Sequence, residues 1–249
     1  MRYTIVSDIG RKRALNEDCA AFISRADSYQ LAIVADGMGG HNAGDVASKM
    51  AVKQLEEYFI EADGASFETT LKTEDWLKET VKSINSSLYK YSLTHEGCQG
   101  MGTTLIAVVF KDTNAVISHV GDSRVYLISS EEVRLITKDH SYVNILVDNG
   151  EISEEEAKSH PKKNYILKSL GTESTIEPDS YQVEMIDDTY MLICSDGLSN
   201  KLTNEEMQTI VMNTSTLEEK GDELVQLAND LGGEDNITLI LLSQSHEEV

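Results

Sequence analysis

Apolar residues along this chain form short runs with the character of β-strands, interrupted by longer stretches with helical periodicity. Three strand-like runs come first, at residues 3–7, 20–24 and 30–35. Two stretches follow, within 47–59 and 77–91, in which the apolar side chains recur on one helical face. We expect both apolar faces to pack on a core.

The rest of the chain shows the same grouping of strands. Strand-like runs occupy 103–110, 115–120, 124–128 and 133–137, then 181–186 and 190–194. A helical stretch at 217–231 leads to a last strand at 237–242. Strands therefore come in adjacent clusters separated by helices, rather than alternating one for one with them. This pattern predicts an α+β fold built on antiparallel sheet, not a doubly wound parallel sheet.

The segment from residue 141 to 170 differs from both patterns. It is polar and charged, with helix-like pieces at 143–147 and 154–160. Nothing in the chain has the composition of an interdomain linker, and proline occurs only at Pro161 and Pro178. We therefore predict a single domain over residues 1–249.

The charge balance narrows the classes of partner. The chain has 21 Lys and Arg against 43 Asp and Glu, a formal net charge of −22. Such a surface repels nucleic acid and anionic membrane, so we expect neither as a partner. A few bound cations could not neutralise this charge, so most of it must be solvated surface. The three cysteines form no CxxC pair, and no signal peptide or membrane span is apparent. We expect a cytoplasmic monomer.

Candidate chemistry comes from aspartates at the ends of strand-like runs. Asp36 ends LAIVAD and precedes GMGG, and Asp196 ends YMLICSD and precedes Gly197. Asp122 lies between two strands in HVGDSRVY, and Asp235 lies just before the last strand in GEDNITLILL. Carboxylates brought together would repel unless cations neutralised them. Oxygen ligands without His or Cys favour Mg²⁺ or Mn²⁺ over Zn²⁺, and no segment has the spacing of a calcium loop.

These aspartates lie in a series of linked motifs, namely SDIGRKRALNEDC, VADGMGGHNAGDVAS, GMGTTL, GDSRVYL, SDGL and GEDNIT. In their order and spacing the chain resembles the type 2C metal-dependent serine/threonine protein phosphatases, from about residue 3 to 243. It is most similar to the compact bacterial members, which have DGMGG where many eukaryotic members have DGHGG. The resemblance implies a central β-sandwich of two antiparallel sheets flanked by helix pairs, with the metal site at one end.

The resemblance also implies a set of metal ligands. Asp36 would bridge two Mn²⁺ or Mg²⁺ ions, and the carbonyl of Gly37 would bind one of them. Asp196 and Asp235 would complete the shell of the first ion, and Glu17 and Asp18 would act mainly through metal-bound water. Asp122, together with Asp196, would hold a third, weaker cation.

The implied reaction is hydrolysis of phosphoserine and phosphothreonine by water bridging the two metals. A water between two cations is acidic enough to supply hydroxide near neutral pH. Arg13 is the candidate to clamp the phosphate, since a guanidinium pairs two oxygens at once. Met38 stands where relatives often have His, so the general acid is open. His41 could donate the proton or serve only as a structural hydrogen-bonding group, and a metal-bound water would need no residue.

Residues 141–170 correspond to the flap beside the active site in relatives. Its polarity fits a lid that contacts substrate, although a solvated insertion without such a role fits as well. The substrates would be phosphoproteins, and relatives suggest a Ser/Thr protein kinase among them.

Three other functions would each account for part of this pattern. Cys19 and Arg25 have the C-x₅-R spacing of cysteine-dependent tyrosine phosphatases, but the residues between them read as a buried strand rather than a phosphate loop. An inactive phosphoprotein-binding scaffold would be expected to lack metal aspartates or Arg13, and all are present. A non-enzymatic acidic cation-binding protein gives no reason for Arg13 beside the carboxylates.

Overall fold

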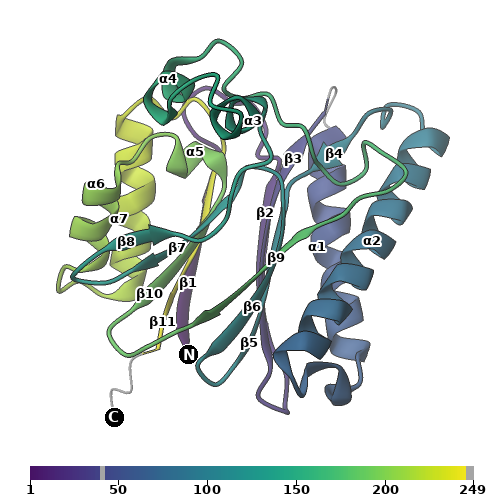
Figure 1. Cartoon of the computed structure of the whole chain (residues 1–249), viewed down its shortest axis with the longest axis horizontal. Coiled ribbons are helices and arrows are strands. Elements are labelled where there is room, and N and C mark those ends of the chain that lie inside the picture. The colour runs from purple at the N-terminus through teal and green to yellow at the C-terminus, as the bar shows by residue number, and fades with distance from the viewer. Residues whose placement is uncertain (40–42, 245–249) are drawn as a thin grey trace.

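Two antiparallel sheets face each other at the centre of the molecule (Figure 1). The structure is a computed structural model that describes residues 1–39 and 43–244, apart from the side chain of residue 158. The strands of the five-stranded sheet are, in spatial order, β1 (Arg2–Asp8), β11 (Ile237–Ser243), β10 (Tyr190–Cys194), β7 (Arg124–Ile128) and β8 (Val133–Leu135). Its interior strand β11, between β1 and β10, is buried along its whole length, as expected for a strand covered on both faces.

The second sheet has six strands and includes the hairpin that carries Asp18 and Asp36. Its order is β2 (Asp18–Ser24), β3 (Gln30–Met38), β5 (Leu105–Lys111), β6 (Asn114–Val120) and β9 (Asp179–Glu184), and the short β4 (Gly102–Thr103) pairs with β3. The chain passes from this sheet to the other between β6 and β7. Residues 121–123, which include Asp122, therefore form a crossing point between the two sheets.

Helices cover the outer faces of both sheets (Figure 1). The helices α1 (Ala43–Glu61) and α2 (Thr70–Thr94), joined through the 3₁₀ turn η1 (Gly64–Phe67), pack on the six-stranded sheet. On the five-stranded sheet lie α5 (Asp196–Ser199), α6 (Asn204–Val211) and α7 (Leu217–Asp230). One apolar layer lies between each sheet and its helices, and a third fills the space between the two sheets. No helix in the described part of the chain is long and apolar enough to cross a membrane.

Local sequence explains where the helices lie. In α2, Leu77, Val81, Ile84 and Leu88 recur on one face and are buried against the sheet. The helices α6 and α7 each begin with a capping box, in which a threonine and the glutamate three residues later satisfy each other's backbone N–H groups.

The predicted α+β class with two antiparallel sheets flanked by helix pairs is confirmed. Some local predictions need correction. The strand predicted at 133–137 ends at Leu135, the strand predicted at 181–186 spans Asp179–Glu184, and α6 was not predicted. Only Met207, Ile210 and Val211 of α6 are buried, so its apolar stripe spans a single turn.

The segment 141–170 contains α3 (Tyr142–Asp148) and α4 (Glu154–Ser159). Its two ends meet at a bridge between Ser141 and Ile166, and the backbone N–H of Leu167 donates to the carbonyl of His140 at 2.8 Å. We call this segment the flap. It lies at the same end of the molecule as α5, which begins at Asp196 (Figure 1).

Candidate metal centre and phosphate site

Asp18 and Asp36 lie directly opposite each other in the antiparallel pair β2–β3. The backbone of Asp36 is held on its other side by two threonines. Its N–H donates to Thr104 Oγ1 at 2.9 Å, and its carbonyl accepts from the Thr104 N–H at 2.8 Å and from Thr103 Oγ1 at 2.9 Å. Hydrogen bonds on both edges therefore fix the strand end that carries this carboxylate.

The carboxylate of Asp18 links the two sheets. Ser195, which immediately precedes Asp196, donates its hydroxyl to Asp18 Oδ2 at 2.7 Å. Asp18 is only 6% exposed, and its other oxygen, Oδ1, is buried without a hydrogen-bond partner. A buried carboxylate oxygen without a partner is costly, so this atom needs a proton or a cation.

Asp196 and Asp235 come from the five-stranded sheet. Asp196 follows β10 and begins α5, and Asp235 lies just before β11. Their loops pack backbone against backbone, since a Cβ at Gly197 would lie 2.0 Å from the carbonyl oxygen of Asn236. Only glycine permits this approach, which brings the two carboxylates to one place.

Asp122 occupies the turn between β6 and β7 and is 8% exposed. Its Oδ1 is also buried without a partner. The neighbouring Ser123 hydroxyl forms a 2.8 Å hydrogen bond with Thr104 Oγ1, the group that accepts from the Asp36 N–H. The turn bearing Asp122 is thereby attached to the strand end bearing Asp36.

Burial and mutual repulsion both act on the pKa values of these carboxylates. Burial raises the pKa of Asp36 well above its ordinary value, and the charges of Asp18, Asp196, Asp122 and Asp235 raise it further. Burial also raises the pKa of Asp18 and of Asp196 to about 6 and that of Asp122 to about 8. Negative charge is therefore strongly disfavoured here unless a cation offsets it.

This donor set fits hard divalent cations such as Mg²⁺ or Mn²⁺. It consists of carboxylates, and two of their oxygens are buried without partners. Within the described residues, no three acidic, His or Cys side chains are drawn together as a ready-made coordination sphere. Mg²⁺ keeps several waters and takes few carboxylates, so a loose carboxylate group suits it better than it would suit a fully dehydrated ion.

Glu17 lies beside the start of α1. Its carboxylate accepts hydrogen bonds from the backbone N–H groups of Gly44 and Asp45, and burial raises its pKa. Its carbonyl accepts from the Gly37 N–H at 3.1 Å and from Ser48 Oγ at 2.6 Å. A Cβ at Gly37 would lie 2.1 Å from the Gly44 carbonyl oxygen, so Gly37 packs tightly at this junction. In this structure Glu17 caps a helix next to the predicted metal ligands.

Arg13 lies at the exposed edge of the carboxylate group. Its Nη2 is 2.7 Å from Asp235 Oδ2, and its side chain is 45% exposed. A phosphate approaching the carboxylates from solvent would meet this guanidinium. His41, the candidate general acid, lies outside the described residues.

Asn236, which the sequence pattern did not single out, shapes the site. This buried side chain donates to the carbonyls of Ile9 and Leu15 at 3.0 and 2.9 Å and accepts from the Glu17 N–H at 2.9 Å. It thereby holds the loop that carries Arg13 against the start of β11. The available signal was an asparagine directly before a fully apolar strand.

Comparison with known proteins agrees with this geometry. A model of the protein phosphatase 2C family matches residues 10–235. The chain belongs to the protein phosphatase 2C family. The serine/threonine phosphatase stp of Listeria monocytogenes is 42% identical over 238 residues, which are 96% of this chain and 94% of that protein.

Solved structures of 2C phosphatases share the fold. The serine/threonine phosphatase of S. agalactiae superimposes with a TM-score of 0.93 at 38% identity, covering 98% of this chain and 99% of that one. The catalytic domain of PstP in complex with two manganese ions gives a TM-score of 0.82 at 34% identity and covers 96% of each chain. The predictions of a 2C phosphatase and of dependence on divalent metal are confirmed.

The arrangement around Cys19 and Arg25 excludes the cysteine-phosphatase alternative for this 2C phosphatase. Cys19 lies near the start of β2, so the residues between it and Arg25 are extended strand rather than a phosphate-binding loop. Burial raises the pKa of the Cys19 thiol, which opposes thiolate formation. The Arg25 guanidinium pairs with Asp27 at 2.8 Å and donates to the carbonyls of Phe59 and Ala62.

Proposed function

We propose that this 2C phosphatase hydrolyses phosphoserine and phosphothreonine esters of proteins by direct attack of water, without a covalent phosphoenzyme. The observation that supports this best is the convergence of strand-end carboxylates from both sheets beside the exposed guanidinium of Arg13. Buried, mutually repelling carboxylates suit divalent cations, and a guanidinium suits the phosphate of the substrate.

In this proposal Asp36 contacts two cations, and Asp196 and Asp235 complete the shell of the first. The carbonyl of Gly37 contacts one cation, and two acidic residues act mainly through water, namely Glu17 and Asp18. Asp122 and Asp196 hold a third, weaker cation. When bound, the cations supply a water acidic enough to attack phosphorus near neutral pH.

Arg13 would bind two phosphate oxygens and offset the charge that accumulates on them in the transition state. Its pairing with Asp235 keeps it at the edge of the carboxylate group before substrate arrives. The leaving alkoxide would take a proton from His41 or from water.

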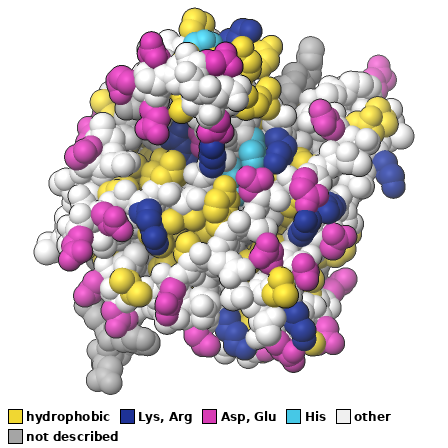
Figure 2. Space-filling view, viewed as in Figure 1, with side chains coloured by type: hydrophobic (Ala, Val, Ile, Leu, Met, Phe, Trp, Pro, Cys, Tyr) yellow, Lys and Arg dark blue, Asp and Glu magenta, His cyan; other side chains and the backbone are white. Residues whose placement is uncertain are grey.

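The whole chain would act as one phosphatase domain on cytoplasmic phosphoproteins, among them a Ser/Thr protein kinase, and would work as a monomer. Acidic side chains are scattered over the face seen in Figure 2, which disfavours nucleic acid and anionic membrane as partners. The flap lies at the same end of the molecule as α5, which begins at Asp196, and would contact the substrate chain.

Hydrolysis of p-nitrophenyl phosphate tests this function. We expect turnover with Mn²⁺, none with EDTA, and resistance to vanadate. Inhibition by vanadate would indicate a cysteine enzyme instead. Mn²⁺ binding without turnover, on this substrate and on a phosphothreonine peptide, would indicate a scaffold or a cation-binding protein.

A further inference from the structure

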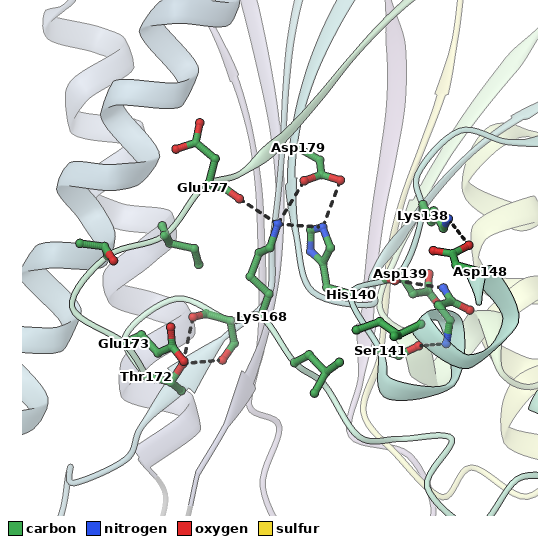
Figure 3. Close-up of a pocket in the computed structure, with 16 residues that line it drawn as sticks. Lys138, Asp139, His140, Ser141, Asp148, Lys168, Thr172, Glu173, Glu177 and Asp179 are labelled. Carbon is green, nitrogen blue, oxygen red and sulfur yellow. Dashed lines mark hydrogen bonds and ion pairs between the residues drawn. The ribbon is translucent and has the colours of Figure 1, made fainter. Parts of the chain in front are cut away.

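A cavity of about 450 Å³ is lined by residues at the start of the flap and by the segment that follows it as far as Asp179 (Figure 3). Its lining includes His140, Lys168 and Asp179, which lie just before the flap, near the end of the flap and at the start of β9. These residues lie outside the carboxylate group described above, yet one of them reaches the turn that carries Asp122.

His140 contacts Gly121 at two points. The backbone N–H of His140 donates to the Gly121 carbonyl at 2.7 Å, and the backbone N–H of Gly121 donates to His140 Nδ1 at 3.0 Å. Gly121 directly precedes Asp122 and adopts a φ of +111°, a conformation that residues other than glycine rarely adopt. His140 therefore hydrogen-bonds both the N–H and the carbonyl of a residue whose conformation requires glycine.

The second of these contacts, from the Gly121 N–H to Nδ1, determines the tautomer of the ring. An Nδ1 that accepts from an N–H carries no proton, so the proton of a neutral ring lies on Nε2. Nε2 is 3.2 Å from Asp179 Oδ2, a suitable acceptor. Lys168 Nζ also lies 3.3 Å from Nε2, but both groups are donors, so its real partners are Asp179 Oδ1 at 3.1 Å and the Glu177 carbonyl at 2.9 Å.

The imidazole ring of His140 also packs against a second histidine. His119 of β6 stacks under it with ring centroids 4.9 Å apart and an interplanar angle of 23°. Burial lowers the pKa of both rings, that of His119 to about 3, which favours the neutral forms. Figure 3 shows the contacts of His140 and Lys168 with Asp179. Together with the bond from Gly121 to His140 they form a continuous chain of contacts from Gly121 to Lys168.

We propose that His140 is a positioning residue, which holds the turn bearing Asp122 and joins it to the base of the flap. The inference rests on the proposed role of Asp122 in a third cation site. It explains why the flap ends are tied to a strand turn rather than left in solvent. A disturbance at Lys168 or Asp179 would reach Asp122 through one imidazole ring.

Two amide substitutions separate the contact of His140 with Gly121 from its contact with Asp179. In His140→Asn the side-chain oxygen can take the place of Nδ1 and accept from Gly121, but the amide does not extend to Asp179. In His140→Gln the amide extends toward Asp179, but no acceptor lies where Nδ1 was. Because the contact with Gly121 is the one that holds the turn of Asp122, we expect His140→Asn to bind the weak cation as tightly as wild type, although its contact with Asp179 is lost. We expect His140→Gln to bind this cation roughly tenfold less tightly, as is usual when a residue behind a metal ligand is lost.

The test is a titration of each variant with Mn²⁺ followed by electron paramagnetic resonance, with kcat and KM for a phosphothreonine peptide measured on the same preparations. His140→Gln should show weaker Mn²⁺ binding at the weak site and a lower kcat. Its KM and its Mn²⁺ binding at the tight sites should be unchanged. Lys138→Ala, in the same cavity but paired with Asp148, should behave as wild type. Equal loss in the Asn and Gln variants, or no loss in either, would overturn the proposal.

A spectroscopic measurement covers the case in which His140→Gln does not fold. The ¹⁵N spectrum of the wild-type imidazole near neutral pH should show Nδ1 without a proton and Nε2 with one. The opposite tautomer would contradict the contact with Gly121. Because this spectrum does not depend on turnover, an inactive wild-type enzyme would refute the proposed function without deciding the role of His140.

Discussion

Arg13 donates to the carboxylate of Asp235 across 2.7 Å, so the candidate phosphate-binding residue is held by a candidate metal ligand. Asp235 Oδ1 also accepts from the backbone N–H of Asn236 at 2.8 Å. A cation at Asp235 would compete with Arg13 for the same carboxylate and free the guanidinium for an incoming phosphate. Cation binding and phosphate binding would then be coupled through one side chain.

Arg13→Ala should lower kcat/KM for phosphopeptides by roughly 10–100-fold, the effect of losing hydrogen bonds to a charged group. Mn²⁺ binding measured by calorimetry should stay near wild type, because the carboxylates remain. Arg11→Ala, an exposed arginine of the same loop, is the matched control. Unchanged kcat/KM in Arg13→Ala would show that this residue is only surface charge.

Asp36→Asn should separate stability from activity. Burial and neighbouring charges disfavour the Asp36 carboxylate, so removing its charge should raise the melting temperature of the protein in EDTA. The same change should reduce turnover with Mn²⁺ by more than tenfold, about 1.4 kcal/mol of barrier or more. A variant that keeps more than about a tenth of the wild-type rate would refute the role of Asp36 at both cations.

The stability of the metal-free protein should fall as pH rises. The folded-state pKa values of Asp18, Asp196 and Asp122 are about 6, 6 and 8, against ordinary values near 4 in the unfolded chain. At these three carboxylates the folded chain therefore holds more protons than the unfolded chain between about pH 4 and pH 8, so they make the free energy of unfolding decrease with pH. Below about pH 6.5 His119, whose pKa burial lowers to about 3, opposes this decrease, so the slope should be clearest above that pH.

Thermal melting in EDTA from pH 5 to pH 8 measures this slope. Saturating Mn²⁺ should flatten it, because the cation replaces the protons. Asp122→Asn should flatten mainly the part between pH 6 and pH 8. A melting temperature that rises with pH in EDTA above about pH 6.5 would contradict the predicted proton uptake.

Asp122→Ala should leave the two tight Mn²⁺ sites occupied and reduce turnover. A cation held by few carboxylates keeps most of its waters and binds weakly, so its loss should not empty the other sites. Metal binding and phosphatase rate must be measured on one preparation. Empty tight sites would make Asp122 a principal ligand, and no change in either quantity would make it a turn residue without catalytic role.

Asn236→Ala should destabilise the protein by about 1–3 kcal/mol for buried groups left without partners. It would leave the carbonyls of Ile9 and Leu15 and the N–H of Glu17 unpaired. We expect a lower melting temperature together with a higher KM, because the Arg13 loop loses its attachment. Exposed Asn149→Ala is the control, and an equal effect there would remove the special role of Asn236.

The strand ends of the site could be predicted from the sequence, whereas their convergence could not. Asp36 and Asp196 each end an apolar run and precede glycine, a local signal. Their meeting depends on the register of β2 with β3 and on the packing of Gly197 against Asn236, which are contacts between distant segments.

The supporting polar residues were missed for the same reason. Thr104 bonds to a residue 68 positions away, and Ser195 to one 177 positions away. In sequence each is only a small polar residue beside an apolar strand. The assignment of individual ligands and of Arg13 stays a prediction until the variants above are measured.

The origin of the carboxylates in two different sheets has a consequence for the core. Asp18 and Asp36 belong to one sheet, Asp196 and Asp235 adjoin strands of the other, and the layer between the sheets includes Ile117 and Ile193. The thickness of that hydrocarbon layer sets how far apart the two pairs of charges stand. Substitutions that change its volume would therefore alter cation affinity without touching any ligand, and drift in such core residues could tune the enzyme's metal requirement.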